Sequence, residues 1–513
     1  MDGTNVVLNI LCRLPVKSLK RFQSASKSCH DLIHKPDFIT QHLHVFNSSR
    51  KFDDERRHSS CLLVNGIGTW WERYRPTRFL HKVYINLLDL DETNGEVNSR
   101  HVLNLPLDYE DENPDVQILG PCNGIYCLHR TNEYDMLHVI TVVNVALREV
   151  KLVPEPNIPL PLGFQQMRYG THCVGFGFDP KTSDYKFVLV RVCYLDSWDG
   201  EYDHLQLQLC GCYITKTKRP CLNANHNDRP HYTSQIVVYS LNCNSWKNLD
   251  DYVHDSNLVE LEYADVCSGG HQCSTYLDGV CYWWMYSHLV GGFSTPGDYW
   301  TLLYFNLVDQ VLGQMRLPPE MLVFDDSDGR LLSRAGSISV YEESLCVIIT
   351  MGDWTTDMRL AENYKPGFPY FDIWVMHHPD SWTKQFTMKE AIEGLWRPSG
   401  FCSSNGRLFI TDMTYPSDDD QTMMVTGRLV IYDPSTQQCT NFHVSRPDET
   451  GNRFGVTAYA YSESLVSVIG DVRDDQNMLF TIAQDHLFHD LTALGKRLIY
   501  GRFRFWDIDF DQE

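Results

Sequence analysis

Long hydrophobic runs are missing from this sequence of 513 residues. No apolar stretch reaches the roughly 18–20 residues that a membrane-spanning helix requires. The first residues, Met1-Asp2-Gly3-Thr4, have neither the basic flank nor the apolar centre of a signal peptide. The 17 cysteines are odd in number and scattered, so without an export signal we expect them to be reduced and mostly buried. These absences predict a cytoplasmic protein that does not enter a membrane.

The motifs of common enzyme classes are missing as well. The chain has no Gly-x-Ser-x-Gly nucleophile turn, no phosphate-binding loop, no His-Glu-x-x-His and no Cys-x-x-Cys pair. Cys267, His271 and Cys273 are the best metal-ligand candidates, but no fourth ligand is evident and zinc sites more often use paired motifs. We therefore expect no catalytic residue, no bound metal and no cofactor, which makes an enzyme the least favoured functional class.

Positive charge is scarce, and the formal net charge is −22. Residues 1–45 hold six Lys and Arg against three Asp, so the rest of the chain is strongly acidic, with clusters at 53–55, 110–112, 325–326 and 418–420. Such a surface repels nucleic-acid phosphate, which argues against DNA or RNA binding. It would speed the encounter with a basic partner. The alternative is that the acidic side chains only keep a large domain in solution.

Apolar residues between Val6 and Leu43 recur at helical spacing. The first stripe ends at Leu14-Pro15, because proline cannot continue a helix. Further stripes follow, and three or four short helices in this space would form a small bundle. A bundle of that size has too little core to be stable alone, so we expect it to dock on something else.

After residue 60 the apolar period changes to about two, which is typical of β-strands. A unit of two consecutive hairpins recurs five times, and the second hairpin of each unit is apolar. In several units the first hairpin bends at Asn-Gly or Asp-Gly. The second hairpin begins near Ile236, Leu303, Asp372 and Leu429, with a weaker copy at Val142. Units of about four strands at this spacing fit the blades of a β-propeller, and a β-sandwich is the alternative architecture.

A sixth unit at 456–461 lacks its partner hairpin. The runs 61–66 and 83–88 belong to no other unit, so we expect them to complete this blade and to close the ring, which would remove exposed sheet edges. The sequence thus predicts a mainly β protein, divided into a helical module at 1–46, a linker at 47–60, a propeller of about six blades at 61–470 and an extension of uncertain structure at 471–513. In that extension, leucines between 479 and 498 could line a helix, and 503–510 alternate like a strand.

The helical region closely resembles a plant F-box. The resemblance is carried by the run VVLNILCRLPVKSLKRF at 6–22, by Ser26-Lys27-Ser28 and by Asp31-Leu32-Ile33. Two features depart from the pattern. The opening Leu-Pro pair and its acidic residue are missing, and Cys29 stands where a tryptophan is expected. In F-box proteins both features belong to the face that binds the linker subunit of a ubiquitin ligase. The two departures therefore bear on the affinity of this chain for such a linker subunit.

The rest of the chain resembles the kelch-related F-box-associated domain of the same proteins. Gly120-Pro121-Cys122-Asn123-Gly124-Ile125 and the stretches 175–186 and 372–384 match its landmarks, and the whole resemblance covers residues 4–469. Within that family, 83–87 and 274–279 resemble the S-locus F-box proteins of Rosaceae, which act in pollen and recognise non-self ribonucleases of the style.

The resemblance implies a non-catalytic substrate-recognition subunit of an SCF-type (cullin-RING) E3 ubiquitin ligase. The helices would bind the Skp-type linker subunit and through it the cullin, and the propeller would bind a target protein, in the S-locus case a basic style ribonuclease. An F-box scaffold or decoy that acts outside a ligase is the alternative. Contacts with the linker subunit are expected from the apolar residues Ile10, Leu14, Pro15, Leu19 and Leu32. For Ile10 and Leu32, packing inside the bundle is the competing role.

Target binding is expected on loops, because binding residues concentrate on loops that a rigid scaffold holds in place. The long inserts at 194–233 and 284–300 are the candidates.

Overall fold

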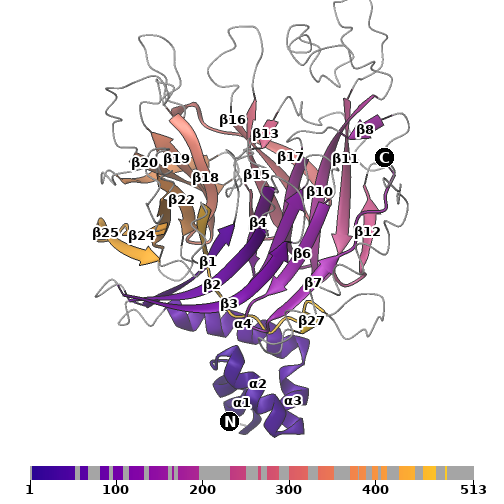
Figure 1. Cartoon of the computed structure of the whole chain (residues 1–513), viewed down its shortest axis with the longest axis vertical. Helices are drawn as coiled ribbons and strands as arrows, with labels where there is room; N and C mark the ends of the chain where they lie inside the picture. Colours follow the sequence, from indigo (N-terminus) through magenta and orange to yellow (C-terminus); the bar gives the residue numbers. More distant parts are fainter. Residues whose placement is uncertain are drawn as a thin grey trace, which may run out of the picture.

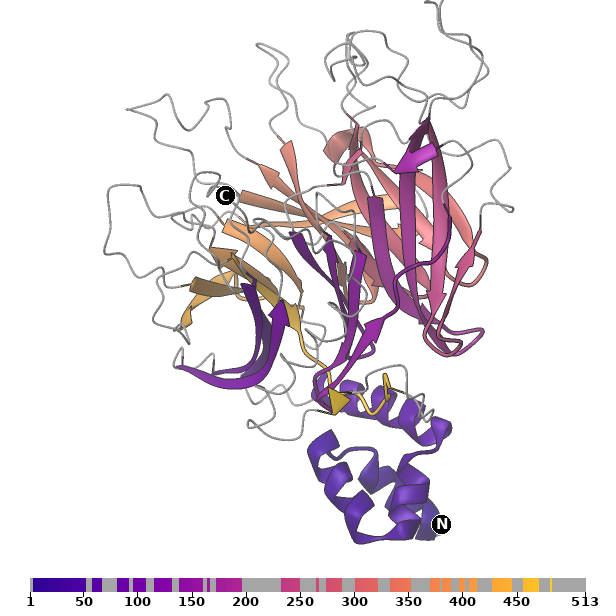
Figure 2. The same cartoon turned by 45° about the vertical axis from the view of Figure 1, so that its right-hand side comes forward.

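The computed structural model describes four helices and a large β domain (Figures 1 and 2). The described residues are 3–51, 58–66, 81–91, 96–107, 115–131, 138–159, 164–166, 172–195, 232–249, 264–266, 274–287, 300–321, 333–351, 370–378, 381–388, 396–401, 406–412, 427–444, 455–469 and 480–481.

The N-terminal bundle consists of α1 (Gly3–Leu11), α2 (Val16–Ala25), α3 (Lys27–Ile33) and α4 (Pro36–Lys51). α1 ends at Leu11, and Pro15, which cannot continue a helix, stands at the N-cap position of α2. Ser26 caps α3, because its side chain accepts a hydrogen bond from the Cys29 backbone N–H. The expected bundle is confirmed, although α4 continues to Lys51 and is longer than the predicted module.

The strands of the described residues form six antiparallel sheets, which are the blades of the predicted propeller. Blade 1 contains β1 (His58–Gly66), β2 (His81–Asp91), β3 (Glu96–Leu107) and β26 (Gly455–Ala460). Blade 2 contains β4 (Asp115–Cys122), β5 (Ile125–Thr131), β6 (His138–Asn144), β7 (Glu149–Val153) and β27 (Phe480–Thr481). Blade 3 contains β8 (Phe164–Gln166), β9 (His172–Asp179), β10 (Asp184–Leu195), β11 (Tyr232–Ser240) and β12 (Ser245–Asn248).

The remaining blades repeat the pattern. Blade 4 contains β13 (Ala264–Val266), β14 (Ser274–Leu277), β15 (Val280–Ser287), β16 (Trp300–Asn306) and β17 (Val311–Arg316), followed by a 3-10 turn at Pro319–Met321. Blade 5 contains β18 (Ser333–Tyr341), β19 (Ser344–Met351), β20 (Tyr370–His378) and β21 (Ser381–Met388). Blade 6 contains β22 (Trp396–Phe401), β23 (Leu408–Asp412), β24 (Gly427–Asp433) and β25 (Gln438–Val444).

Blade 1 closes the ring with strands from both ends of the domain. β26 pairs antiparallel with β1, with Leu63 opposite Ala458, and β1 pairs in turn with β2. The predicted closure of 61–66 and 83–88 onto 456–461 is therefore confirmed. Across the seam with blade 2, the Tyr126 hydroxyl donates a 2.7 Å hydrogen bond to the Ala460 carbonyl oxygen.

Apolar clusters between neighbouring blades form the core of the ring. At one seam, Gly175 and Gly177 of β9 let the backbone approach blade 4 closely. A Cβ on Gly177 would lie 2.2 Å from the Tyr276 ring, and a Cβ on Gly175 would lie 2.8 Å from the Trp283 ring. The Tyr276 hydroxyl then reaches the Phe178 carbonyl oxygen at 2.7 Å. This packing explains why glycine is needed at 175 and 177.

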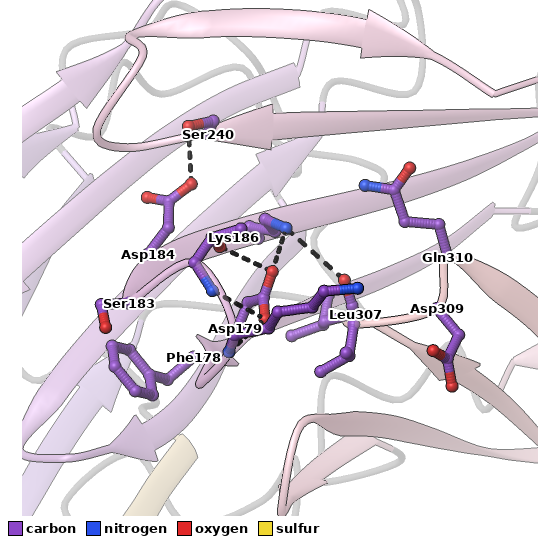
Figure 3. A network of polar contacts seen from close by, with 12 residues as sticks. Phe178, Asp179, Ser183, Asp184, Lys186, Ser240, Leu307, Asp309 and Gln310 are labelled. Carbon is purple, nitrogen blue, oxygen red and sulfur yellow. Dashed lines mark hydrogen bonds and ion pairs between the residues drawn. The ribbon is translucent and has the colours of Figure 1, made fainter.

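A buried polar network fixes the turn between β9 and β10 (Figure 3). Lys186, 7% exposed, donates to the Asp179 carboxylate, which is 1% exposed, and its Nζ lies 3.5 Å from the Leu307 carbonyl oxygen of the neighbouring blade. Asp179 also accepts from the Thr182 hydroxyl at 2.6 Å and the Lys181 backbone N–H at 2.9 Å. Burial raises the pKa of Asp179, but the hydrogen bonds from Lys186, Thr182 and Lys181 outweigh burial and hold it below its ordinary value.

The same turn chemistry occurs again between β24 and β25. There Asp433 begins an Asp-Pro-x-Thr turn like that at Asp179 and accepts from the Ser435 backbone N–H at 2.8 Å and from Arg407 Nη2 at 3.2 Å. Aspartate and proline at the first two positions favour such a turn, since the carboxylate bonds the backbone ahead of it and proline presets φ. The local sequence therefore determines the conformation of these two turns.

Two further expectations can be compared with the structure. β1 begins at His58, so the connection from the helices is shorter than the predicted 47–60. Phe480 and Thr481, from the predicted extension, pair with Val150 and Glu149 at the outer edge of blade 2. The remainder of that extension, including 503–510, lies outside the described residues.

The network makes a testable prediction. Replacing Lys186 with Met should lower the free energy of unfolding by about 3–5 kcal/mol, because it leaves the Asp179 carboxylate buried without its cation. Lys181→Met is the matched control, since Lys181 lies in the same turn with an exposed side chain. Chemical denaturation measures both variants, and equal losses of stability in the two would contradict the role assigned to Lys186.

Candidate functional site

The N-terminal bundle exposes an apolar surface. Val6 and Val7 lie about one turn before Ile10 on α1; the three are 48%, 48% and 56% exposed, and Phe22 on α2 is 44% exposed. In contrast, Leu11, Cys12, Val16, Leu19, Ile33 and Phe38 form the buried core of the bundle. Exposed large apolar side chains on a small bundle are candidates for contact with another protein. We call Val6, Val7, Ile10 and Phe22 the exposed quartet.

The five residues predicted to contact the linker subunit lie in different environments. Ile10 and Pro15 are exposed, and Leu14 and Leu32 are half-buried against the bundle core. Leu19 is fully buried, so its side chain packs the bundle itself. Cys29, at the position where the pattern expects tryptophan, is also half-buried against this core.

Sequence reasoning did not single out Val6, Val7 and Phe22 as surface residues. They belonged to the same helical stripes as the core residues, and a stripe does not show which of its members face a neighbouring helix. The spacing of Val6 and Ile10 was the one available signal that these two share a face.

The bundle contacts the propeller through residues from both ends of the domain. Leu465, which follows β26, belongs to the bundle core, and Ala146 and Leu147 of the β6–β7 turn pack against it. The Val16 backbone N–H donates a 2.6 Å hydrogen bond to Glu463 Oε2. α2 thus begins against a carboxylate from the propeller, an arrangement that its helix dipole favours.

His42 lies inside this part of the bundle with no exposed surface. Its Nε2 donates to the Leu14 carbonyl oxygen at 2.9 Å, which ties α4 to the end of the first helical segment. Burial lowers the pKa of His42, while the hydrogen bond to Leu14 and the charge of Glu463 act in the opposite direction. A lowered pKa favours the neutral ring, in the tautomer that donates through Nε2 to Leu14.

The contact with the bundle defines the near face of the propeller, which carries the short turns such as 180–183, 278–279 and 307–310. These turns lie side by side, since Gly279 is next to Pro180 and Lys186 reaches the Leu307 carbonyl oxygen. Strand direction alternates within each blade, so the long connections leave from the opposite ends of the strands, which we call the far face. In Figure 1, β10 ends and β11 begins at the end of the propeller away from the helices.

The two inserts predicted to bind the target consist mostly of connections between strands, and these connections leave the strands at the far face. The segment 196–231 joins β10 to β11 and the segment 288–299 joins β15 to β16, and both lie outside the described residues. The acidic residues are concentrated in far-face connections too. The segments 108–114, 250–263 and 413–426 together contain 12 Asp and Glu and no Lys or Arg.

The result for a metal site is negative in the part of the chain that the structure describes. That part contains no cluster of three His, Cys, Asp or Glu able to hold a metal ion, and Cys267, His271 and Cys273 lie outside it. Nine cysteines whose side chains are described are free, and six of them are buried: Cys12, Cys122, Cys127, Cys173, Cys281 and Cys346. None of the described helices is long and apolar enough to cross a bilayer.

Comparisons with known proteins agree with this architecture. The family model for the F-box associated β-propeller domain matches residues 77–468, and the model for the F-box domain matches residues 4–41. The F-box protein CPR1 of Arabidopsis thaliana is 24% identical over 394 residues, which cover 75% of this chain and 72% of that protein. An F-box/kelch-repeat protein of the same plant is 27% identical over 186 residues, which cover 35% of this chain and 42% of the relative. An N-terminal F-box, the F-box associated β-propeller that follows it and the plant F-box proteins among its relatives together place this chain in the family of plant F-box proteins with an F-box-associated β-propeller domain.

Proposed function

We propose that the chain presents a target protein to an SCF-type ubiquitin ligase, with the linker subunit on the exposed quartet and the target on the far face of the propeller. F-box proteins of this family act as substrate-recognition adaptors, and the F-box implies a Skp-type linker partner. The observation that supports the proposal most directly is the separation of an apolar docking surface on the helices from the far face at the other end of the molecule (Figure 2). Catalysis by such an adaptor is by proximity, since it raises the local concentration of reactants that other subunits activate.

The exposed quartet suits the linker subunit because a few apolar anchors dominate most protein interfaces. Ile10 contributes most exposed surface of the four, and Pro15 is exposed where the chain turns from α1 into α2. Leu14 and Leu32 contribute the part of their side chains that the bundle leaves uncovered. The side chain of Leu19 is buried, so it packs inside the bundle and does not form part of this surface.

For the target, the proposal specifies a basic protein. The connections of the far face carry dense negative charge, while the near-face turns hold few acidic residues, among them Asp309, Glu342 and Glu343. Long-range attraction would speed the encounter and contribute to specificity through charge complementarity. A style ribonuclease is the more specific candidate, from the resemblance of 83–87 and 274–279 to S-locus F-box proteins, and it stays a prediction.

Action outside a ligase is the second candidate function, and Cys29, which stands where the F-box pattern has tryptophan, favours it. A decoy or scaffold would bind a target without recruiting a cullin. Co-purification of the chain with both a Skp-type linker subunit and a cullin distinguishes the two functions. A chain that binds its target but captures neither subunit acts as a scaffold or decoy.

The docking surface predicts the effect of one substitution. Ile10→Asp should weaken capture of a Skp-type linker subunit at least about tenfold, because the interface would bury an unpaired charge in place of an apolar anchor. The substitution should leave folding intact, since the Ile10 side chain is mostly exposed. Val311→Asp is the matched control, a residue 54% exposed on the propeller. Pull-down with purified linker subunit measures both variants, and undiminished capture by Ile10→Asp would show that the docking surface lies elsewhere.

The acidic far face predicts a salt-dependent encounter. Binding of a basic style ribonuclease should weaken as salt rises, chiefly through kon, since surface attraction is screened over about 8 Å at physiological ionic strength. Changing Asp418, Asp419 and Asp420 to Asn should lower kon, whereas neutralising Asp309, Glu342 and Glu343 on the near face should not. Surface plasmon resonance gives both rates. Salt-independent binding would limit the charge to a role in solubility.

Specificity is tested separately in the same measurement. Exchanging 194–233 for the segment of a related chain should change which ribonuclease binds and leave the salt slope largely unaltered. Equal binding of an unrelated basic protein such as cytochrome c would show that the attraction carries no recognition.

A further inference from the structure

Residues 461–469 form a strap that runs from β26 in blade 1 across the near face of blade 2 and contacts the N-terminal bundle. The strap has no regular secondary structure, yet it is largely buried, with Ser464 at 0%, Val468 at 1% and Leu465 at 7% exposure. An irregular segment buried to this degree needs partners for its backbone polar groups. Those partners show what the strap does.

Blade 2 holds the strap in a fixed position. The fully buried Asn144 side chain donates to the carbonyl oxygens of Ser464 at 3.0 Å and Val466 at 2.7 Å. The Val468 N–H donates to Glu149 Oε2 at 3.0 Å. Gly124, with φ +77°, leaves room for the strap, since a Cβ there would lie 2.6 Å from the Ser462 carbonyl oxygen. The strap is therefore a rigid part of the propeller surface.

The strap presents two side chains to the helices. Glu463 accepts the Val16 N–H, an amide at the start of α2 that has no partner within its own helix. Leu465, two residues further on, enters the core formed by Leu11, Val16, Leu19 and Phe38. One contact is polar and directional and the other is apolar, so together they restrain both the distance and the rotation of the bundle relative to the propeller.

We propose that Glu463 and Leu465 are positioning residues that fix the orientation of the F-box bundle relative to the target-binding propeller. The inference rests on the proposed adaptor function and adds to it a specific mechanical role for the strap. An adaptor works by proximity, and small displacements of one reactant relative to the other reduce the rate and the selectivity of transfer. A fixed bundle restricts transfer to those lysines that the geometry places within reach of the ubiquitin-loaded enzyme. A bundle that pivots brings other lysines within reach.

Truncation of the strap side chains leaves most of the bundle core in place, and Ala146 and Leu147 still pack against it. The core keeps Leu11, Cys12, Val16, Leu19, Ile33 and Phe38 when Leu465 is truncated. His42 still joins α4 to Leu14. The exposed quartet lies on α1 and α2 and makes no contact with the strap in the described hydrogen bonds and core cluster. Capture of the linker subunit therefore serves as the control for a folded bundle.

The first test uses the full chain alone and does not depend on the adaptor function. Fluorescent amino acids are incorporated at Lys27 on α3 and at Lys181 on the near face, both exposed, and single-molecule energy transfer reports the distance between them. The wild-type chain should give one narrow distribution, and the combined Glu463→Ala and Leu465→Ala variant a broad one. Glu463→Gln should give an intermediate width, because the amide oxygen still accepts the Val16 N–H without the charge. Glu155→Ala, an exposed glutamate after β7, is the matched control. An unchanged narrow distribution in the combined variant would overturn the proposal.

The second test measures the consequence in a reconstituted ligase that contains a Skp-type linker subunit, a cullin and a RING protein. The probe is self-ubiquitination of the chain, with the modified lysines mapped by mass spectrometry. Wild type should modify a restricted set of lysines, and the combined variant a wider set, with unchanged capture of the linker subunit. An identical set in both overturns the positioning role even if the distance distribution broadens. Failure of the wild-type chain to capture the linker subunit would instead refute the proposed adaptor function and leave the distance measurement standing.

Discussion

Antiparallel pairing between β26 and β1 is the constraint on which the rest of the structure depends. Without it, blade 1 would expose an unpaired strand edge and the ring would open between its first and last units. The pairing also places the chain that follows β26 against the near face of blade 2. There Asn144 donates a hydrogen bond to it, and Gly124 allows its backbone to approach closely. Ring closure thus helps to place the helical bundle, because the strap after β26 brings Glu463 and Leu465 to it, beside the contacts that Ala146 and Leu147 of blade 2 make.

The polar interactions at the near face hold the turns between strands in a defined conformation. In the turns that begin at Asp179 and Asp433, each carboxylate accepts a hydrogen bond from the backbone N–H two residues further on. Lys186 extends the first network to the next blade. Both carboxylates have lowered pKa values despite burial, because several hydrogen bonds and one cation stabilise the charged form. The long connections leave the blades at the opposite ends of the strands, on the far face.

Several features were predictable from the sequence because they depend on short-range physics. Helical spacing and Pro15 located the bundle, period-two runs with Asn-Gly and Asp-Gly bends located the hairpins, and the unpaired runs 61–66 and 83–88 indicated closure with 456–461. The acidic balance, the scarcity of enzyme motifs and the resemblance of 6–22 to an F-box are likewise properties of the chain read in order. These features determined the fold class and the adaptor interpretation.

Only the tertiary structure decided which apolar residues are free to bind. Leu19 and Ile10 look equivalent in a helical stripe, yet Leu19 is completely buried and Ile10 is 56% exposed, because burial depends on neighbouring helices and on Leu465, more than 400 residues away. Glu463 gave no signal in sequence, since its partner is a backbone N–H at the start of α2 and a backbone amide leaves no residue-type pattern. The sequence by itself determined the elements and their order, and the tertiary structure decided which surfaces are exposed and how the two parts are held together, because those depend on contacts between residues distant in the chain.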